Sequence, residues 1–498
     1  MKVAAAKEDT PSRAWCLQLP GTVDQKFWNV VYLGICFLTS SAASSTITNL
    51  QKVILAGIHD DNPEYDGDGY IGLAISCSFT AVSLWLAPSF LTLTGSKNAL
   101  IIGAVGELIF SGSFYLESTL IFYVVSAISG VTHALLWTGQ GVYLIENSTP
   151  KTVVRDSSIF WFLYHISPVL GNVSAFCTLA GKSSVDAGTR VMILDVMNVI
   201  LALSVVMFCF LPASSPRRKN PDQAATITDP ASEPKPEDCA EALRQAWLVF
   251  TDTHMLALMI LFVYSGLQIA YSETIYNSSV GFTLSLSQNV KELVPLTGIF
   301  NGIGILLGVC IQTLQQAKAF NWTNSVYLTI GIQFQLICYV LTGLNLPNES
   351  AFGDTQKTGV LFNSVPLALL SSVLLGIGNM SIQTYVSSLI ATLFWERSSQ
   401  VSAIFNFSEF VWSAVCFIYS TRIGLYAQLV ILIITAILGN IVYILVETRV
   451  RKRRDAASRK TAVNCDVENN NRNNELVRKL KDSYVSAEIM TFRMLPEE

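Results

Sequence analysis

The sequence predicts an all-α transmembrane protein whose twelve helices form two six-helix pseudo-repeats. Of its 498 residues, 51% are hydrophobic and only 14% are charged, whereas soluble globular proteins carry about 25% charged residues. Apolar runs of about 20 residues recur along the chain, and each is long enough to cross ~30 Å of hydrocarbon as a helix. The composition therefore excludes an ordinary soluble enzyme. A net charge of −4 also gives no basic field for nucleic-acid binding.

The apolar runs and the polar breaks between them define the expected spans. Because only helices satisfy every backbone polar group within one segment in lipid, each run is read as a helix. The spans are expected at residues 27–49, 70–93, 99–116, 120–145, 157–180, 191–212, 255–275, 293–314, 324–345, 360–392, 401–421 and 426–446.

The positions of the basic residues predict the orientation. An even number of spans places both termini on one side, and 26 of the 32 Lys and Arg residues fall on that side. Since basic residues are concentrated on the cytoplasmic side of membrane proteins, both termini are expected in the cytoplasm. The protein is thus expected to be a multi-pass protein of the lipid bilayer, and the plasma membrane and the endolysosomal membrane both fit.

A polar linker divides the chain into two similar halves. The linker is rich in Pro and charge, and the fifth and eleventh expected spans match at Ile159/Ile404 and Phe160/Phe405, each pair 245 residues apart. This arrangement is typical of transporters built from two repeats, and it predicts the major facilitator superfamily fold. The expected segments are a cytoplasmic N-terminal segment (1–26), a six-helix bundle (27–212), a cytoplasmic linker (213–254), a second six-helix bundle (255–446) and a disordered basic cytoplasmic tail (447–498).

Several runs of residues resemble one known family. GYIGLAISCSFTAVSLWLAPSF from Gly69, LLWTGQGVYLIENST from Leu135 and RDSSIFWFLYHISPVLGN from Arg155 look like the ion channel regulatory protein family named for the nematode uncoordinated-ninety-three protein. YSGLQIAYSETIYNSSVGF from Tyr264 and LTGIFNGIGILLG from Leu296 are similar to its subgroup named for major facilitator superfamily domain-containing protein eleven. The resemblance implies an atypical major facilitator fold, and it implies relatives that act as accessory subunits of potassium channels or as trafficking partners of receptors.

Two functions follow as expectations. The first is an accessory or regulatory role beside a channel or receptor subunit. Typical transporters of this superfamily have an acid and basic residues in the loop after the second span, where they hold the cytoplasmic gate closed. Here that loop reads LTLTGSKNAL, which contains Gly95 and Lys97 of the motif but lacks the acid and the second basic residue. This departure favours the accessory role. The alternative is an orphan secondary transporter that moves a small solute by alternating access, with proton coupling. No motif for an enzyme, a cofactor or a metal occurs in the sequence.

Ionisable and amide side chains inside the spans are the candidate cavity and proton-coupling residues, because such groups are costly in lipid unless paired or hydrated. Glu409 and His165 rank first, since they occupy nearly equivalent places in the two repeats. The complete set is Glu107, His133, Gln140, His165, Asn172, Asp195, Glu273, Gln383 and Glu409.

Structural roles compete with these functional ones. Asp195 and Glu273 lie near the expected outer boundaries, where simple hydration explains them, with Arg190 as a partner for Asp195. Glu107 stands alone among apolar neighbours, which indicates either a partner distant in sequence or a lipid-facing edge. The histidines and amides are equally explained by hydrogen bonds between packed helices.

Sequons in the expected outer loops predict glycosylation at two sites. Asn277 in YNSS and Asn348 in PNES lie on the predicted outside, and only outside sequons can carry a glycan.

Overall fold

The computed structural model of the 498-residue chain is an assembly of long helices. The described residues are 25–149, 151–181, 185–213, 253–316, 322–361, 363–393, 398–452 and 475. The predicted N-terminal segment, linker and tail therefore lie almost wholly outside the described residues.

Twelve helices of the described part are long and apolar enough to cross a membrane, which confirms the predicted fold class. The seventh span is formed jointly by α8, a π-helical turn η3 and α9. The elements are α1 (Gln25–Asp61), α2 (Gly69–Thr94), α3 (Ser96–Gly112), α4 (Thr119–Glu146), α5 (Val153–Leu179), α6 (Ala187–Phe210), α8 (Thr253–Ala270), η3 (Tyr271–Ile275), α9 (Tyr276–Phe282), α10 (Leu293–Gln316), α11 (Asn324–Asn345), α12 (Val365–Leu393), α13 (Ser398–Ser420) and the last span, Leu425–Lys452.

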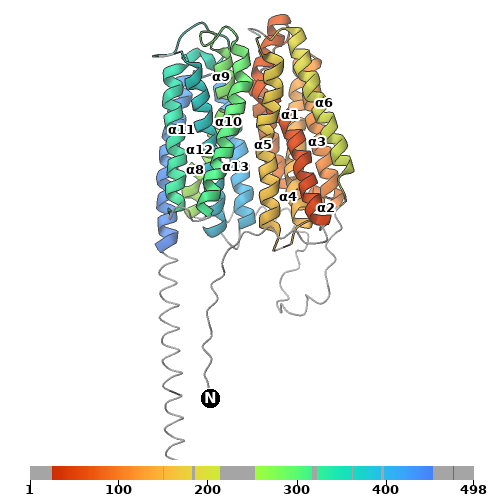
Figure 1. The fold of residues 1–498 in the computed structure, drawn as a ribbon, viewed down its shortest axis with the longest axis vertical. Coiled ribbons are helices and arrows are strands. Elements are labelled where there is room, and N and C mark those ends of the chain that lie inside the picture. Colours follow the sequence, from red (N-terminus) through yellow and green to blue (C-terminus); the bar gives the residue numbers. More distant parts are fainter. Residues whose placement is uncertain are drawn as a thin grey trace, which may run out of the picture.

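The helices form two bundles that stand side by side, α1–α6 in red to yellow and α8–α13 in green to blue (Figure 1). We call them the first half and the second half. The end that carries the loop between α1 and α2 is called the outer end, following the charge-based prediction, and the opposite end is called the inner end. Helices α2 and α13, and α5 and α10, pack along the boundary between the halves.

Several spans are longer than the sequence predicted, and two extensions lie at the outer end. Helix α1 continues to Asp61 instead of ending at residue 49, and the seventh span continues to Phe282 instead of residue 275. Polar side chains in the extensions, such as Gln51 and Asn277, are buried against other helices. Because these side chains are shielded from water by protein, the helix can continue past the point where the apolar run stops.

At the outer end the two halves share their hydrophobic cores. Tyr70 and Leu73 of α2 belong to the core of the second half, whereas Phe282 and Val294 belong to the core of the first half. Each half thus inserts apolar side chains into the other, which seals the outer end against water.

At the inner end the cores are separate. In the described part of the chain, the two remaining hydrophobic clusters contain residues of the first half alone, including Phe37 and Phe160 in one and Leu91 in the other. The halves still touch along α2 and α13, where the rings of Trp85 and Phe407 lie 5.8 Å apart. The arrangement is therefore sealed outside and less tightly joined inside.

Candidate functional site between the two halves

Glu107 has partners from two other helices of the first half. Its side chain on α3 is buried, and it accepts a hydrogen bond of 2.5 Å from the Ser40 hydroxyl of α1. Its other carboxylate oxygen lies 4.0 Å from Nδ1 of His133 on α4. Of the two alternatives that the sequence left open, a lipid-facing edge is therefore wrong, and a partner distant in sequence is correct.

His133 connects this acid to the boundary between the halves. The indole Nε1 of Trp137 donates to His133 Nε2 at 3.0 Å, one turn along α4. Since Nε2 accepts this bond, Nδ1 carries the ring proton of the neutral imidazole and faces Glu107. The imidazole ring also lies 6.0 Å from the ring of Phe410 in the second half.

Glu409 also has partners from two other helices, both in the second half. Its Oε1 accepts a bond of 2.6 Å from the Ser265 hydroxyl of α8 and one of 2.7 Å from the Gln383 amide of α12. In both halves, a serine of the first span therefore donates to a carboxylate on another helix. Hydrogen bonds to ionised carboxylates are roughly twice as strong as neutral ones.

Glu273 is an exposed acid on the seventh span. Its side chain is exposed, although Ser272 and Thr274 on either side have no exposed surface. The turn η3, which carries Glu273, packs against α1 of the first half. This exposed carboxylate therefore lies on an element of the boundary between the halves. The expectation that Glu273 lies near the outer boundary is wrong, because the helix continues to Phe282.

Aromatic rings of α4 and α5 contact one another in a continuous row. Trp137 and Trp161 stack with their ring centres 5.9 Å apart, and Tyr164 meets Trp137 edge-on at 5.1 Å. His165 stacks on Trp161 at 5.8 Å. We call these four residues the aromatic wall. Its Trp137 donates to His133, which lies 4.0 Å from Glu107, so the wall lies beside that acid.

Asn172 belongs to the outer seal instead of this central site. Its Oδ1 accepts from the amide of Asn49 on α1 at 3.2 Å, and Asn49 Oδ1 accepts from the amide of Asn277 on α9 at 3.1 Å. We call these three residues the asparagine chain. Its members are 7%, 0% and 0% exposed in the order Asn49, Asn172 and Asn277. The chain joins the two halves by neutral, buried hydrogen bonds.

The asparagine chain corrects the glycosylation prediction. Asn277 lies inside the seventh span with no exposed surface, so a glycan has no room there. Asn348 lies in an outer loop and is half-buried, and its Oδ1 accepts from the backbone of Tyr426 at 2.9 Å. Glycosylation at Asn348 stays a prediction.

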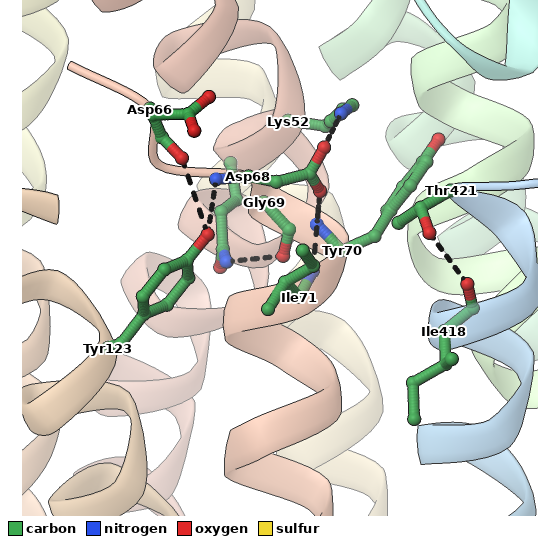
Figure 2. A network of polar contacts seen from close by, with 10 residues as sticks. Lys52, Asp66, Asp68, Gly69, Tyr70, Ile71, Tyr123, Ile418 and Thr421 are labelled. Atoms are coloured by element: carbon green, nitrogen blue, oxygen red, sulfur yellow. Dashed lines mark hydrogen bonds and ion pairs between the residues drawn. The ribbon is translucent and has the colours of Figure 1, made fainter. Parts of the chain in front are cut away.

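An ion pair holds the outer end of α2 in place (Figure 2). Lys52 of α1 pairs with Asp68, whose Oδ1 also caps α2 by accepting from the Tyr70 backbone at 2.7 Å. Figure 2 shows the Tyr70 ring between this pair and Thr421 of the second half, and the ring stacks with Phe417 at 6.3 Å. The pair therefore fixes the residue that enters the other half's core.

Two candidates lie away from the central site. Asp195 is exposed and accepts a bond of 2.7 Å from the Tyr115 hydroxyl. The expected pair of Asp195 with Arg190 is wrong, because Arg190 binds Asp61 at 2.9 Å and lies 3.6 Å from Glu117.

Gln140 is buried on α4, the helix that also carries His133. The separation of seven positions corresponds to roughly 10 Å along the helix. Gln140 therefore lies nearer the inner end than the acids.

Sequence reasoning missed the asparagine chain, although a signal was present. Residues 44–49 read SSTITN and residues 272–277 read SETIYN, so the first spans of both halves share S-x-T-I-x-N. The two final asparagines are the pair that meets between the halves. A search for internal repeats across the first and seventh spans would have found them.

No group of three or more His, Cys, Asp or Glu side chains with metal-binding geometry occurs in the described part of the chain. The acids instead alternate with hydroxyl, amide and aromatic groups. Such a site can bind and release protons and can hold a cation or a polar solute.

Solved structures with the same fold are transporters. The chain is similar to a POT family transporter in complex with 5-aminolevulinic acid, with a TM-score of 0.61 and 12% identity over 86% of this chain and 96% of that one. It is also similar to the nucleoside transporter NupG, with a TM-score of 0.55 and 13% identity over 84% of this chain and 98% of that one. These matches show the major facilitator fold.

Sequence relatives are more specific. UNC93-like protein MFSD11 of Xenopus laevis is 27% identical over 86% of this chain and 98% of its own length. UNC93-like protein 3 of Arabidopsis thaliana is 24% identical over 82% of this chain and 83% of its own length. The family model described as ion channel regulatory protein UNC-93 matches residues 64–444. The resemblance predicted from the sequence is therefore confirmed, and the chain belongs to the UNC-93 family.

Proposed function

We propose that this protein is a secondary transporter for a small solute, coupled to protons through the central acids. The observation that carries the proposal is the exposed carboxylate of Glu273 on η3, a turn of the seventh span that packs against α1 of the other half. A carboxylate inside a membrane span is costly, so it persists where it has a function or a partner. A purely structural scaffold has no need of an exposed acid at this depth.

The asymmetry of the two ends supports alternating access. Tyr70 and Phe282 each enter the core of the opposite half at the outer end. Between described residues, every ion pair lies within a single half, and the asparagine chain is neutral. Rocking of one half against the other would thus break apolar contacts, amide hydrogen bonds and the bond from the Gly181 backbone to Glu292, but it would separate no ion pair between described residues.

Proton coupling would use the like charges of Glu273 and Glu409. A proton bound by either carboxylate removes one of the two negative charges that the seventh and eleventh spans carry. Protonation would therefore change how strongly the site attracts a cation or repels an anion, and the Ser265 and Gln383 donors would hold Glu409 in place through the cycle. This gives a physical link between a pH gradient and solute binding.

Gradient-driven uptake into proteoliposomes tests the proposal. Vesicles containing the full-length protein receive a mixture of polar metabolites under a pH gradient, and mass spectrometry identifies the solutes that accumulate. We expect at least one solute to accumulate about tenfold, Glu409→Gln to abolish this, and Glu349→Gln in an exposed outer loop to leave it unchanged. The absence of any solute dependent on the gradient would reject the transporter function.

A second candidate function is regulation of a channel or receptor, which the family description favours. The connection between α2 and α3 supports it, because it contains Gly95 and Lys97 but no acid for a cytoplasmic gate. Affinity purification of the tagged protein from native membranes in two mild detergents tests this role. A channel or receptor subunit recovered at near-equal stoichiometry supports it, and recovery of none in either detergent contradicts it.

We also propose that both termini face the cytoplasm, in the plasma membrane or an endolysosomal membrane. The supporting observation is the placement of 26 of the 32 basic residues on the side of the termini. Tags at the N- and C-termini should stain only after permeabilisation of the cell. Staining of intact cells would invert the topology and would remove Asn348 from the glycosylated side.

A further inference from the structure

We propose that a cavity in the second half, between α10 and α11, binds a sterol, a flat apolar lipid that carries one hydroxyl group. The inference goes beyond transport, because none of the central acids lines this cavity. It follows from three observations, which are the space between the helices, its apolar lining and a buried tyrosine hydroxyl without a partner.

The packing of α10, α11 and α12 creates the cavity. Figure 1 shows α12 between the other two helices, and both pack closely against it but hardly touch each other. Glycines allow these contacts, since Gly308 of α10 lies against Met380 and Gly331 of α11 lies against Ser381. Helices α10 and α11 thus leave a cavity of about 270 Å³ over α12. A water molecule takes ~30 Å³ in the liquid, so the cavity can hold part of a much larger molecule.

The equivalent helices of the first half pack differently. Helices α2, α3 and α4 are the spans that correspond to α10, α11 and α12 in the two repeats, and α2 and α3 likewise pack on α4. Leu91 of α2, Ala99 of α3 and Leu135 of α4 form a hydrophobic cluster among these three helices. The three-helix arrangement therefore does not require a cavity, and the open space is a property of the second half.

The cavity opens on a surface that faces lipid. The exposed side chains Leu307, Ile311 and Leu314 recur every three or four residues along α10, and they form an apolar stripe on this membrane span. Ile311 and Leu314 also line the cavity, together with Phe334 of α11 and Ile377 of α12. Since hydrocarbon surrounds the stripe, the molecule that enters the cavity is drawn from the bilayer.

Tyr327 distinguishes a sterol from an acyl chain. This residue of α11 lines the cavity and is 5% exposed, and its hydroxyl has no hydrogen-bond partner among the described residues. A buried hydroxyl left unpaired costs free energy. An acyl chain offers no polar atom to it, whereas the hydroxyl of a sterol can donate or accept a hydrogen bond.

The other three hydroxyls of the cavity wall are already bonded. Ser381 donates to a carbonyl of its own helix at 2.9 Å, and Thr384 and Tyr385 donate to the amide oxygens of glutamines on α10. Tyr327 is therefore the wall hydroxyl that remains for a ligand. Its ring is held in place, because it stacks on the Tyr385 ring with the centres 5.9 Å apart.

The level of Tyr327 in the membrane also fits a sterol. Its ring lies 5.6 Å from that of Trp322, a half-exposed tryptophan just before the inner end of α11. Trp side chains collect at the membrane–water interface, where a sterol places its hydroxyl while its rings point to the bilayer centre. From Tyr327 to Phe334 the wall runs roughly 10 Å along α11, away from the inner end, so the rings would lie along it.

Photolabelling with a sterol tests the inference. The full-length protein in phosphatidylcholine nanodiscs is irradiated with a cholesterol analogue that carries a diazirine, and mass spectrometry locates the labelled residues. We expect label on the cavity residues of α10, α11 and α12. Unlabelled cholesterol should reduce it about fivefold or more, and cholestene, which lacks the hydroxyl, should reduce it less than about twofold, because only cholesterol pairs with Tyr327.

Tyr327→Phe removes the hydroxyl and keeps the stacked ring. It should weaken labelling about threefold or more, which corresponds to one lost hydrogen bond. Without sterol the variant should melt at or above the wild-type temperature, because it loses an unpaired buried group, and cholesterol should raise its Tm less than that of wild type. Tyr426→Phe is the control, since its hydroxyl donates to the Leu346 carbonyl at 3.1 Å at the outer end. Its Tm should be lower than that of wild type by the same amount with and without cholesterol.

A second pair of variants tests the space. Ile311 lines the cavity and is 39% exposed, whereas Ile303 lies two turns away on α10, outside the cavity lining, and is 38% exposed. Ile311→Trp should fill the opening and reduce labelling several-fold, and Ile303→Trp should leave labelling unchanged. This pair keeps the inference testable if Tyr327→Phe does not fold, and equal labelling of both variants would overturn it.

Two further outcomes would reject the sterol. Label spread evenly over the lipid-facing helices, or label that cholesterol and cholestene reduce alike, would overturn the inference. Labelling of the cavity by a diazirine-bearing phosphatidylcholine that cholesterol does not displace would also overturn it, and would assign the space to an acyl chain. None of these measurements depends on solute uptake, so failure of the proposed transport function and failure of the sterol site are distinguishable.

Discussion

The outer end and the centre of this protein use buried polar side chains in opposite ways. At the outer end, Asn49 and Asn277 bond to each other across the boundary between the halves. At the centre, Glu107 and Glu409 are bonded to donors of their own half, and Glu273 has no donor among the described residues. Buried neutral amides thus join the halves at the outer end, where the Glu292 carboxylate also accepts from the Gly181 backbone of the first half at 2.8 Å. The acids of the centre are instead bonded within one half.

This difference matters because the two kinds of contact respond differently to movement. A neutral hydrogen bond contributes only about 0.5–1.5 kcal/mol net, so a short chain of amides can open and close. An ion pair broken in a low-dielectric interior leaves an uncompensated charge, which costs about 3–5 kcal/mol. A boundary that carries amides at one end and no ion pair between described residues is suited to two conformations.

The largest loss of stability is expected at Gly171, where α5 packs closely against α1 beside the asparagine chain. A Cβ at Gly171 would lie 1.7 Å from the backbone oxygen of Ala42, a contact that flexible side chains cannot relieve. Gly171→Ala should therefore separate the helices and lower stability by about 3 kcal/mol or more. Thermal unfolding followed by fluorescence-detected size exclusion measures this.

Gly141→Ala is the matched control on the neighbouring helix α4. A Cβ there meets nothing within 4 Å, and alanine is the better helix former by up to about 1 kcal/mol. We expect this variant to melt at or above the wild-type temperature. Equal destabilisation by both substitutions would show that the close approach of α1 and α5 does not hold the outer end.

Asn277→Ala should cause the next largest loss of stability, and it should loosen the outer end. It removes the amide that donates to Asn49 Oδ1 at 3.1 Å and leaves a buried acceptor unsatisfied, at a cost of about 1–3 kcal/mol. Hydrogen–deuterium exchange should increase in residues 276–282 and 290–298, which lie at the sealed boundary. The central residues of α11 should exchange as in wild type.

The matched control is Asn198→Ala on α6. The Asn198 amide donates to the Leu194 carbonyl of its own helix at 2.8 Å, away from the boundary. Its removal should leave exchange in α9 and α10 unchanged. If the two variants increased exchange alike, loss of an amide would weaken the whole protein, and the asparagine chain would have no special role.

The fold was predictable because the apolar runs along the chain give the number and the approximate positions of the spans. A helix that crosses ~30 Å needs about 20 apolar residues, and all twelve predicted spans overlap the helices found. The ends were less predictable, since α1 continues through Asn49 and Gln51 only because other helices bury them. Burial by distant segments is a tertiary effect that the local pattern does not contain.

The site was predictable in its residues but not in its grouping. Glu409 and Gln383 were both candidates, and they bond directly. Glu273 was placed near the outer surface because its span was ended too early, and Asp195 was given the wrong partner. Which acid is central depends on how helices rotate and pack, and one sequence does not specify that rotation.

A smaller difference in stability is expected between variants of the two serine–carboxylate pairs. Ser40→Ala leaves Glu107 with His133 at 4.0 Å, whereas Ser265→Ala leaves Glu409 with the Gln383 donor at 2.7 Å. Hydrogen bonds to charged groups contribute about 1.5–3 kcal/mol, so we expect Ser40→Ala to cost about 1 kcal/mol more. Thermal unfolding of both variants at one pH measures the difference.

Ser45→Ala on α1 is the control for this pair. Its hydroxyl donates at 2.6 Å to the Ser41 carbonyl of the same helix, so its removal touches neither acid. The expected order of Tm is Ser45→Ala highest, then Ser265→Ala, then Ser40→Ala. The reverse order of the last two would mean that Glu107 is better supported than its contacts indicate.

The smallest effect is expected at the exposed pair of Glu349 and Lys357, whose side chains are 44% and 67% exposed. The hydrogen bond that Lys357 donates lowers the pKa of Glu349. A lowered folded-state pKa stabilises above the unfolded pKa, and this contribution disappears as pH falls through the folded value. The Tm difference between wild type and Glu349→Gln should thus be small at neutral pH, shrink on acidification, and shrink in high salt, which screens exposed pairs.

This last comparison decides what closes the outer end. The exposed pair and the asparagine chain lie at the same end, but only the chain crosses the boundary between the halves. If Glu349→Gln lowered Tm as much as Asn277→Ala, loop charges would be holding the outer end. A near-zero effect for the exposed pair, beside increased exchange for Asn277→Ala, would assign the closure to buried amides between the halves.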